Sequence, residues 1–194
     1  MDDLRFVLIR HGETPWNAAG RWQGHSDPSL SAVGREQAAR LAGELTGEPI
    51  DAIIASDLRR AFETATILGD AIGLRPECDA RLRELDVGRW GGETRDQIRL
   101  REPEALGYFD TGSPDARAAE GETRRELAAR VHAAVADIAA RTSVACIALV
   151  VHSGVVRALL PGTQLENGEW KIANFSEIEA NASNLDEVRG AGLL

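Results

Sequence analysis

Cysteine is scarce in this chain, with two residues among 194. Cys78 and Cys146 stand far apart and neither belongs to a CxxC pair, so a disulfide scaffold, a zinc site and dithiol redox chemistry are disfavoured. Cys146 lies in an apolar run and is expected in the core. Because the acidic start at residues 1–4 does not resemble a signal peptide, we expect a cytoplasmic protein.

Long apolar runs are also missing, and none approaches the roughly 20 residues that span a bilayer, so no membrane partner is expected. Lysine is nearly absent, since Lys171 is the only one, and the net charge of −9 argues against a nucleic-acid partner. An acidic enzyme can still bind anionic substrates where its cleft is locally basic. The 43 % of apolar residues in 194 is enough for a globular domain with a sizeable core.

The apolar pattern alternates between strands and helices along the whole chain, so we expect one domain over residues 1–194. Strands are expected at 5–9, 50–55, 74–76, 144–151 and 170–178, and helices at 30–45, 58–72, 93–102, 122–141 and 155–160. Residues 103–121 read as a loop-rich segment. The first long helix would be capped by Ser29 or Ser31, and the second by Ser56 or Asp57. This order predicts a three-layer α/β sandwich whose mostly parallel central sheet has helices on both faces.

Arg10 and His11 stand where the first buried strand ends and a loop opens at Gly12. In open α/β sheets this carboxyl end is where ligands bind. The guanidinium of Arg10 can hold a phosphate by two parallel hydrogen bonds, and neutral His11 can attack its phosphorus. A lone Arg-His pair is more often structural than catalytic, so the interpretation depends on the rest of the chain.

Other chemically capable residues follow the same pattern. His152 ends the apolar strand at 144–151, so it can face His11 across the sheet edge. Ser56 ends another strand, and Arg59 and Arg60 begin the helix after it, where a helix N-terminus favours anions. Glu84 follows in the crossover to the next helix. His25 and His132 are expected to be solvated, one in a loop and one on a helix.

Five blocks of sequence, taken together, resemble the histidine phosphatase superfamily in its phosphoglycerate mutase-like branch. They are Arg10-His11-Gly12-Glu13-Thr14-Pro15-Trp16-Asn17; Trp22-Gln23-Gly24 with Leu30-Ser31 and Gly34; Ser56-Asp57-Leu58-Arg59-Arg60-Ala61; Leu82-Arg83-Glu84-Leu85-Asp86-Val87-Gly88-Arg89-Trp90-Gly91-Gly92; and Val150-Val151-His152-Ser153-Gly154-Val155-Val156-Arg157. They occur in family order from residue 7 to residue 176.

By resemblance, His11 would be the residue that becomes phosphorylated, and Arg10, Arg60 and His152 would complete the phosphate pocket. Arg59 would be a solvated helix charge. Asn17 and Gln23 would be lesser phosphate contacts. Glu84 would be the proton donor.

Phosphoryl transfer needs an in-line nucleophile and positive charge on the equatorial oxygens. Arg10, Arg60 and protonated His152 can supply that charge, so we expect neither a metal nor a cofactor. Nearby arginines would lower the pKa of His11 and keep it neutral for attack. One position departs from the family: Ser153 replaces the usual glycine after the second histidine, and its hydroxyl either contacts the phosphate or narrows the pocket.

The chain lacks the residues that other phosphatase and hydrolase chemistries require. No arginine stands six positions after either cysteine, no Gly-Lys-Ser/Thr occurs, and Ser153 is not in a Gly-x-Ser-x-Gly elbow because Val151 takes the place of the first glycine. The resemblance therefore implies a phosphomonoester hydrolase with a phosphohistidine intermediate. A cofactor-dependent phosphoglycerate mutase and a non-catalytic phospho-ligand binder are the alternatives, and a binder has no use for Glu84.

The phosphatase interpretation is favoured because the family's mutases carry an insertion with basic anchors after the glutamate block and an aromatic residue three positions after the glutamate. Here that position is Val87, and only the 29 residues from Gly92 to Glu120 separate the block from Gly121. Residues 86–121 are the expected cover over the site, with Trp90, Tyr108 and Phe109 more simply packing it than meeting a substrate. Arg99 and Arg101 read as solvated charges, although they are also candidates for a second anion anchor. The partner would be a small phosphate ester; a homodimer is compatible with the sequence.

Overall fold

The computed structural model describes residues 4–183. Its centre is a five-stranded sheet in the order β3-β2-β4-β1-β5. The strands are β1 (Arg5–Arg10), β2 (Ala52–Ala55), β3 (Glu77–Cys78), β4 (Cys146–Val151) and β5 (Trp170–Asn174). The first four are parallel, and β5 pairs with β1 antiparallel at one edge.

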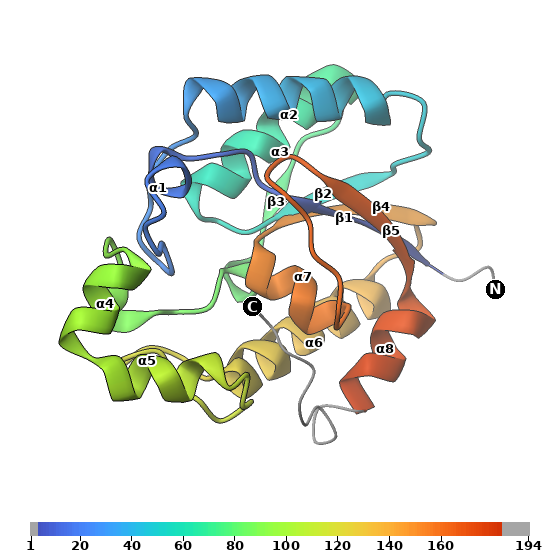
Figure 1. Ribbon diagram of the computed structural model, residues 1–194. Helices are drawn as coiled ribbons and strands as arrows, with labels where there is room; N and C mark the ends of the chain where they lie inside the picture. Colours follow the sequence, from blue (N-terminus) through green and yellow to red (C-terminus); the bar gives the residue numbers. More distant parts are fainter. Residues whose placement is uncertain (1–3, 184–194) are drawn as a thin grey trace.

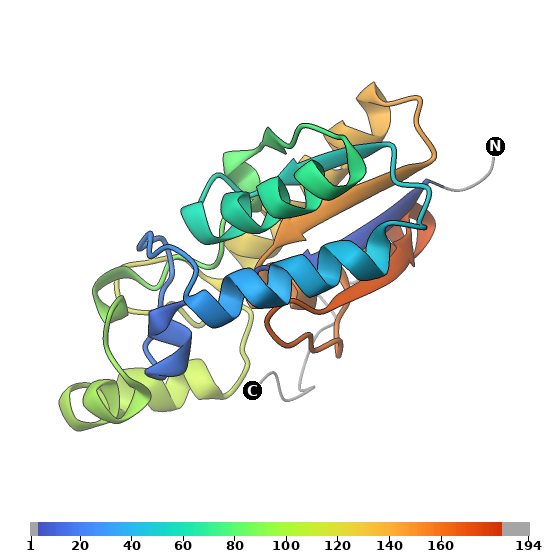
Figure 2. The ribbon, with the colours of Figure 1, turned by 90° about the horizontal axis from the view of Figure 1, so that it is seen from above.

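Helices cover both faces of this sheet, which confirms the expected three-layer α/β sandwich (Figures 1 and 2). The described residues form α1 (Pro15–Ala18), α2 (Ala32–Leu45), α3 (Arg59–Ile72), α4 (Arg95–Arg101), α5 (Pro103–Asp110), α6 (Arg124–Arg141), α7 (Ser153–Leu159) and α8 (Phe175–Ser183). Helices α2 and α3 lie on one face, and α6, α7 and α8 lie on the other. Helices α4 and α5 lie beyond the carboxyl ends of the parallel strands.

Strand β1 is apolar at consecutive positions because both of its faces are covered by helices. Val7 and Ile9 pack with the cores of α2 and α3, whereas Phe6 and Leu8 pack with those of α6, α7 and α8. All four side chains are fully buried. Because each such burial stabilises the fold by roughly 1.5–3 kcal/mol, the sheet centre is strongly specified from both sides.

The parallel pairing of β1 with β4 sets the geometry of the edge where these strands end. Arg10 is in register with Val151, and the His11 amide donates to the Val151 carbonyl at 3.0 Å. The residues after the two strands, His11 and His152, therefore lie side by side. This confirms that both strands are central and that both histidines follow them at one edge of the sheet.

Three predicted elements were wrong in place or type. Residues 103–121 are not simply loop, because Pro103 occupies the first position of α5, where its missing N–H is not needed. The expected strand at 170–178 ends at Asn174, and α8 begins at Phe175. The short strand expected at 74–76 is instead β3, which pairs with the end of β2.

The caps of α2 and α3 and the position of His132 differ in part from expectation. Ser31, not Ser29, caps α2, since its side chain accepts from the Gly34 amide. Neither Ser56 nor Asp57 caps α3: Asp57 is held by Arg83, and the Arg59 amide donates instead to Asp27. His132, expected to be solvated, is buried between α6 and α7.

Helix α2 begins in direct contact with the loop after His11. A Cβ on Gly34 would overlap the backbone carbonyl of Glu13, and a Cβ on Gly12 would overlap the carbonyl of Gly34. Neither contact can relax by rotating a side chain, because backbone atoms form both. The two glycines therefore fix the position of the loop that follows His11.

Two alanine substitutions in α2 test this contact. Gly34→Ala is expected to destabilise the protein by roughly 1–3 kcal/mol, because the added methyl group forces the backbones apart. Gly43→Ala is the matched control: its added methyl group would meet open space, so the helix should gain about 0.5–1 kcal/mol. Urea unfolding measures both, and equal effects of the two substitutions would contradict the packing argument.

Candidate active site

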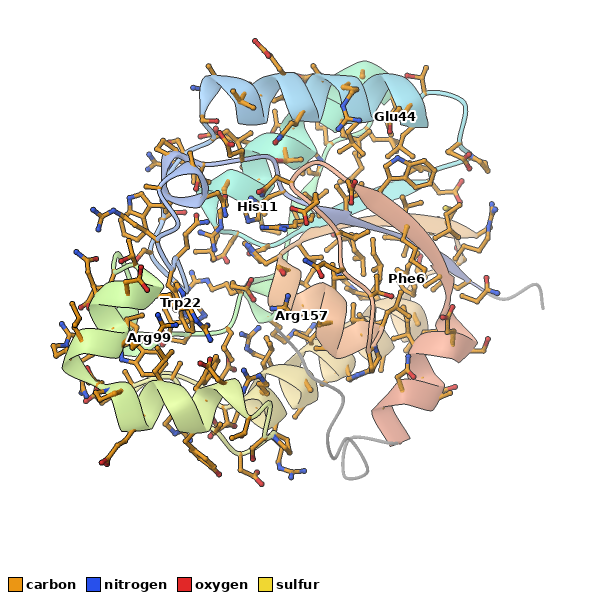
Figure 3. All side chains as sticks on the ribbon, viewed as in Figure 1. Phe6, His11, Trp22, Glu44, Arg99 and Arg157 are labelled. Carbon is orange, nitrogen blue, oxygen red and sulfur yellow. The ribbon has the colours of Figure 1, made fainter. Side chains whose placement is uncertain are left out.

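The imidazole of His11 is buried at the carboxyl end of β1 (Figure 3). Its Nδ1 lies 2.7 Å from the Gly12 carbonyl oxygen. A carbonyl can only accept a hydrogen bond, so Nδ1 carries the proton and the lone pair is on Nε2. Burial, followed by the charge of Arg60, holds the pKa of His11 well below its usual value, so the ring is neutral near pH 7.

Arg10 and Arg60 are fixed by backbone carbonyls. Arg10 donates from Nη1 to Leu165 O at 2.7 Å, and Arg60 donates to Ser26 O at 2.8 Å and to Gly24 O at 2.9 Å. The Nε of each guanidinium is buried and has no partner in the described chain. Burial lowers the pKa of Arg60 to about 10, so it remains cationic at neutral pH. Both side chains therefore hold positive charge with an N–H group to spare, as an anion site requires.

His152 is completely buried, and its ring lies edge-on to that of His11 with the centroids 5.1 Å apart. Neither of its ring nitrogens has a hydrogen-bond partner among residues 4–183. The expectation of a protonated His152 does not hold for the ligand-free protein. Burial, and then the charge of Arg60, holds the pKa of His152 well below its usual value. The neutral ring still offers one N–H donor.

Glu84 faces this group from the segment after the first 3₁₀ turn, Ala80–Leu82. One carboxylate oxygen accepts from the Leu85 amide at 2.8 Å, and the other accepts from the Gly154 amide at 3.1 Å. A side chain on Gly154 would overlap the carboxylate. The start of α7 therefore positions Glu84 through a glycine that gives it room.

Arg130 holds the backbone of the same segment. It donates to the carbonyls of Arg81 and Arg83 at 2.8 Å and to that of Glu84 at 3.0 Å. A two-point ion pair with Glu122 fixes the guanidinium in turn. No local sequence pattern marks Arg130, because the carbonyls that it binds come from a segment more than 40 positions away.

The remaining predicted contacts line the site. The hydroxyl of Thr14 is within hydrogen-bond distance of the amide oxygens of Asn17 and Gln23, which accept from it. The NH₂ groups of both amides are therefore the donors available to a ligand in the cavity. Ser153 lies at the start of α7, and its hydroxyl accepts from Nη1 of Arg157 at 2.6 Å. Ser153, which stands where the family usually has glycine, therefore fixes the side chain of Arg157. Among the described residues, Arg59 does not line the cavity, whereas Arg60 does.

These residues open into a cavity of about 400 Å³. His152 is not among its lining residues, although Arg10, His11, Asn17, Gln23, Arg60, Glu84 and Ser153 are. Four arginines not predicted as site residues also line it: Arg21, Arg124, Arg125 and Arg157. No local pattern marks them, because they come from a loop and two helices that meet only in the fold.

The cover segment contributes Val87, Phe109, Gly112 and Pro114 to the cavity wall. Trp90 is buried against Trp22 and Phe109, which confirms that it packs. Arg99 is exposed and pairs with Asp96, and Arg101 pairs with Glu93 and Glu102. Neither of them supplies a second anchor in the cavity.

Residues 4–183 lack two features, a metal-binding cluster and a membrane-spanning helix. No group of three or more His, Cys, Asp or Glu side chains there is arranged to hold a metal ion. In the same part of the chain, no helix combines the length and the apolar character that crossing a bilayer requires.

A family model described as "Histidine phosphatase superfamily (branch 1)" matches residues 6–184. The chain belongs to this superfamily. Among curated relatives, a probable phosphoglycerate mutase GpmB of Yersinia pestis (strain Pestoides F) is 42 % identical over 132 residues. That match covers 68 % of this chain and 61 % of the Yersinia protein, so it spans less than two thirds of the relative.

Solved structures of the superfamily share the fold. A mycobacterial glucosyl-3-phosphoglycerate phosphatase is 35 % identical, with a TM-score of 0.79 over 87 % of this chain and 92 % of that one. YhfR of Bacillus stearothermophilus is 31 % identical, with a TM-score of 0.81 over 87 % and 90 %. A putative alpha-ribazole-5'-P phosphatase of Escherichia coli is 26 % identical, with a TM-score of 0.80 over 89 % and 90 %. The named relatives thus include a mutase and phosphatases.

The two buried histidines of this superfamily member predict acid-sensitive stability. His11 and His152 have pKa values below those of the unfolded chain, so the unfolded state binds more protons below about pH 6.5. Their contribution to stability is complete above that pH and is lost as the pH falls toward the folded pKa, by up to about 1.4 kcal/mol per pH unit for each ring. Urea unfolding between pH 7.5 and 5.5 measures the slope, and His152→Gln should make it shallower. An unchanged slope in the variant would contradict the prediction.

Gly154→Ala should impair catalysis without unfolding the protein. The added methyl group displaces the flexible end of Glu84, so we expect a loss on the order of 10²-fold in kcat/KM for an alkyl phosphate. Gly107→Ala on α5, where the added methyl group meets open space, is the control. Thermal melting should change little in either variant. Wild-type kcat/KM in Gly154→Ala would show that the position of Glu84 is not critical.

Proposed function

We propose that this histidine phosphatase superfamily member hydrolyses phosphomonoesters of small metabolites through a phosphohistidine on His11. The observation that supports it most is the state of the His11 ring, which is neutral and lies among cationic side chains with unpartnered N–H groups. The Gly12 carbonyl accepts the Nδ1 proton of this ring, so the lone pair is on Nε2. A general base or a structural histidine needs no such surroundings. A nucleophile that attacks phosphorus does.

The first step forms a bond between Nε2 of His11 and phosphorus as the ester P–O bond breaks. Arg10 and Arg60 stabilise the charge on the equatorial oxygens. Glu84 in its acid form gives its proton to the departing oxygen, which leaves as the alcohol. The second step reverses these roles: Glu84 takes a proton from water, the water oxygen attacks phosphorus, the P–N bond breaks, and phosphate leaves with His11 neutral again.

The proposed reaction uses guanidinium groups for the charge that a metal ion supplies in other phosphoryl-transfer enzymes. Arg10 and Arg60 are fixed by carbonyls before substrate arrives, so little reorganisation is needed in the transition state. The proposal therefore includes turnover in the presence of a chelator. His152 joins the phosphate site as a donor through its unpartnered ring nitrogens.

A phosphoglycerate mutase is the second candidate, because a relative with 42 % identity is named as one. Mutase chemistry returns the phosphoryl group to a neighbouring hydroxyl and needs water excluded meanwhile. We favour hydrolysis, since Val87 and the short segment from Gly92 to Glu120 lack the features of the mutase branch. Incubation with 3-phosphoglycerate, with and without 2,3-bisphosphoglycerate, separates the two. Rapid formation of 2-phosphoglycerate with little free phosphate would establish the mutase.

Glu84→Gln tests the acid–base step, because it keeps the shape but cannot donate a carboxyl proton. We expect a loss on the order of 10²–10⁴-fold in kcat/KM, which reports the first step, for an alkyl phosphate, and a much smaller loss for p-nitrophenyl phosphate, whose leaving group needs no proton. Steady-state kinetics with EDTA present gives both values.

His11→Ala should abolish turnover of both substrates while the fold survives. Glu104→Gln, an exposed change on α5, serves as the matched control for the loss of one carboxylate and should behave as wild type. Equal losses in kcat/KM for the two substrates in Glu84→Gln would exclude its role as the acid. Wild-type turnover in His11→Ala would exclude the whole mechanism.

A further inference from the structure

The catalytic groups account for only part of the cavity. Its volume of about 400 Å³ lies within the range of roughly 300–1,000 Å³ in which proteins bury a ligand of substantial size. Phe109, Pro114, Leu127 and Ala128 form an apolar wall around the remaining space. The substrate of the proposed phosphatase therefore has a body beyond its phosphoryl group, and the polar groups on that wall define what the body carries.

Arg124 stands on this wall at the first position of α6. Its guanidinium carbon lies 3.8 Å from the centre of the Phe109 ring, and Nη1 donates to Ser113 O at 3.4 Å. Burial, and then the charge of Arg157, lowers the pKa of Arg124. The side chain is therefore a stacked, partly desolvated cation fixed at the cavity, unlike a solvated arginine on an exposed helix face.

Arg157 of α7 lines the same cavity as Arg124. Its Nη1 donates to the hydroxyl of Ser153, and its charge adds to the effect of burial in lowering the pKa of Arg124. The cavity therefore holds two guanidiniums beyond the catalytic residues, one from α6 and one from α7, whose positive charges act on each other.

No carboxylate in residues 4–183 forms an ion pair with Arg124 or Arg157. Asp110, which acts on the charge of Arg124, is paired with Arg95, and neighbouring Arg125 is paired with Asp115. Glu84 is the one acidic residue among the described residues that line the cavity, and two backbone amides hold it. Like charges held together in a partly buried site destabilise the free protein, and an anion between them relieves that repulsion.

We propose that Arg124 and Arg157 form a second anion site, so that the substrate is a phosphomonoester that carries a further carboxylate or phosphate. The phosphoryl group lies at His11 and Arg10, the apolar wall contacts the linking carbons, and the second anion accepts from Arg124 and Arg157. This inference rests on the proposed function. It extends that function from phosphate esters in general to those with a second anionic group.

Matched substrate pairs test the second site. 3-Phosphoglycerate is compared with glycerol 1-phosphate, and propane-1,3-diol bisphosphate with propyl phosphate, while p-nitrophenyl phosphate reports on the catalytic end alone. The wild-type protein should favour one second anion, carboxylate or phosphate, by at least about tenfold in kcat/KM, as expected for charge-assisted hydrogen bonds. The substrate pair with the larger preference shows whether the second anion is a carboxylate or a phosphate.

Arg124→Gln and Arg157→Gln should each reduce that preference by roughly 10-fold to 100-fold, mainly through KM, and this loss should exceed any change in kcat/KM for p-nitrophenyl phosphate, which carries no second anion. Arg99→Gln removes a guanidinium that does not line the cavity and is the matched control. If Arg124→Gln loosens the stack on Phe109 and fails to fold, Arg157→Gln, which leaves that stack in place, carries the test.

The outcomes separate this inference from the function on which it rests. Turnover of p-nitrophenyl phosphate without any preference for a second anion in the wild-type protein would overturn the second site and leave the phosphatase standing. Equal losses for all substrates in both variants would overturn it as well. Absence of p-nitrophenyl phosphate turnover in the wild-type protein would instead contradict the proposed function.

Discussion

The parallel register of β1 on β4 is the constraint on which the site depends. With Arg10 opposite Val151, the chain leaves both strands at the same level, and His11 and His152 become neighbours. A slip of one residue would turn every side chain of β1 to the other face, exposing Val7 and Ile9 to the wrong layer. The apolar burial on both faces of the sheet therefore also fixes the distance between the two imidazoles.

Positive charge in this acidic protein is concentrated where the sheet ends. Within residues 4–183, six arginines line the cavity, although the net charge of the chain is −9. Desolvating a guanidinium is unfavourable, and carbonyl acceptors from Gly24, Ser26 and Leu165 offset part of that cost for Arg60 and Arg10. Arginine suits this task better than lysine, because its planar group can bind carbonyls and an oxyanion at the same time.

The sequence is informative where chemistry and periodicity coincide. The strand ends and the meeting of His11 and His152 at one edge of the sheet follow from patterns within short segments, whereas the choice of Arg60 over Arg59 rests on the family resemblance. Helix α5 escapes prediction because Pro103 resembles a helix breaker, although a proline at the first helical position starts a helix readily. The turn from β5 into α8 escapes it because weak alternation continues past Asn174.

The placing of Arg124 and Arg157 in the cavity could not be predicted from the sequence, for a different reason. Arg124 and Arg157 look like ordinary charges on amphipathic helices, and only the packing of α6 against α7 brings them to one wall. His132 misleads for the same reason, since a polar side chain on a helix gives no sign that another helix covers it. Contacts between helices distant in sequence are set by tertiary packing, which leaves no local pattern.

The central claim is that the phosphoryl group passes through His11. Rapid mixing with p-nitrophenyl phosphate, an alkaline quench within one turnover and peptide mass spectrometry test it most directly. We predict one added phosphoryl group on the peptide that begins after Arg10, assigned to His11, stable in alkali and lost on brief acid treatment. Release of p-nitrophenol with that peptide unmodified throughout the first turnover would contradict the account.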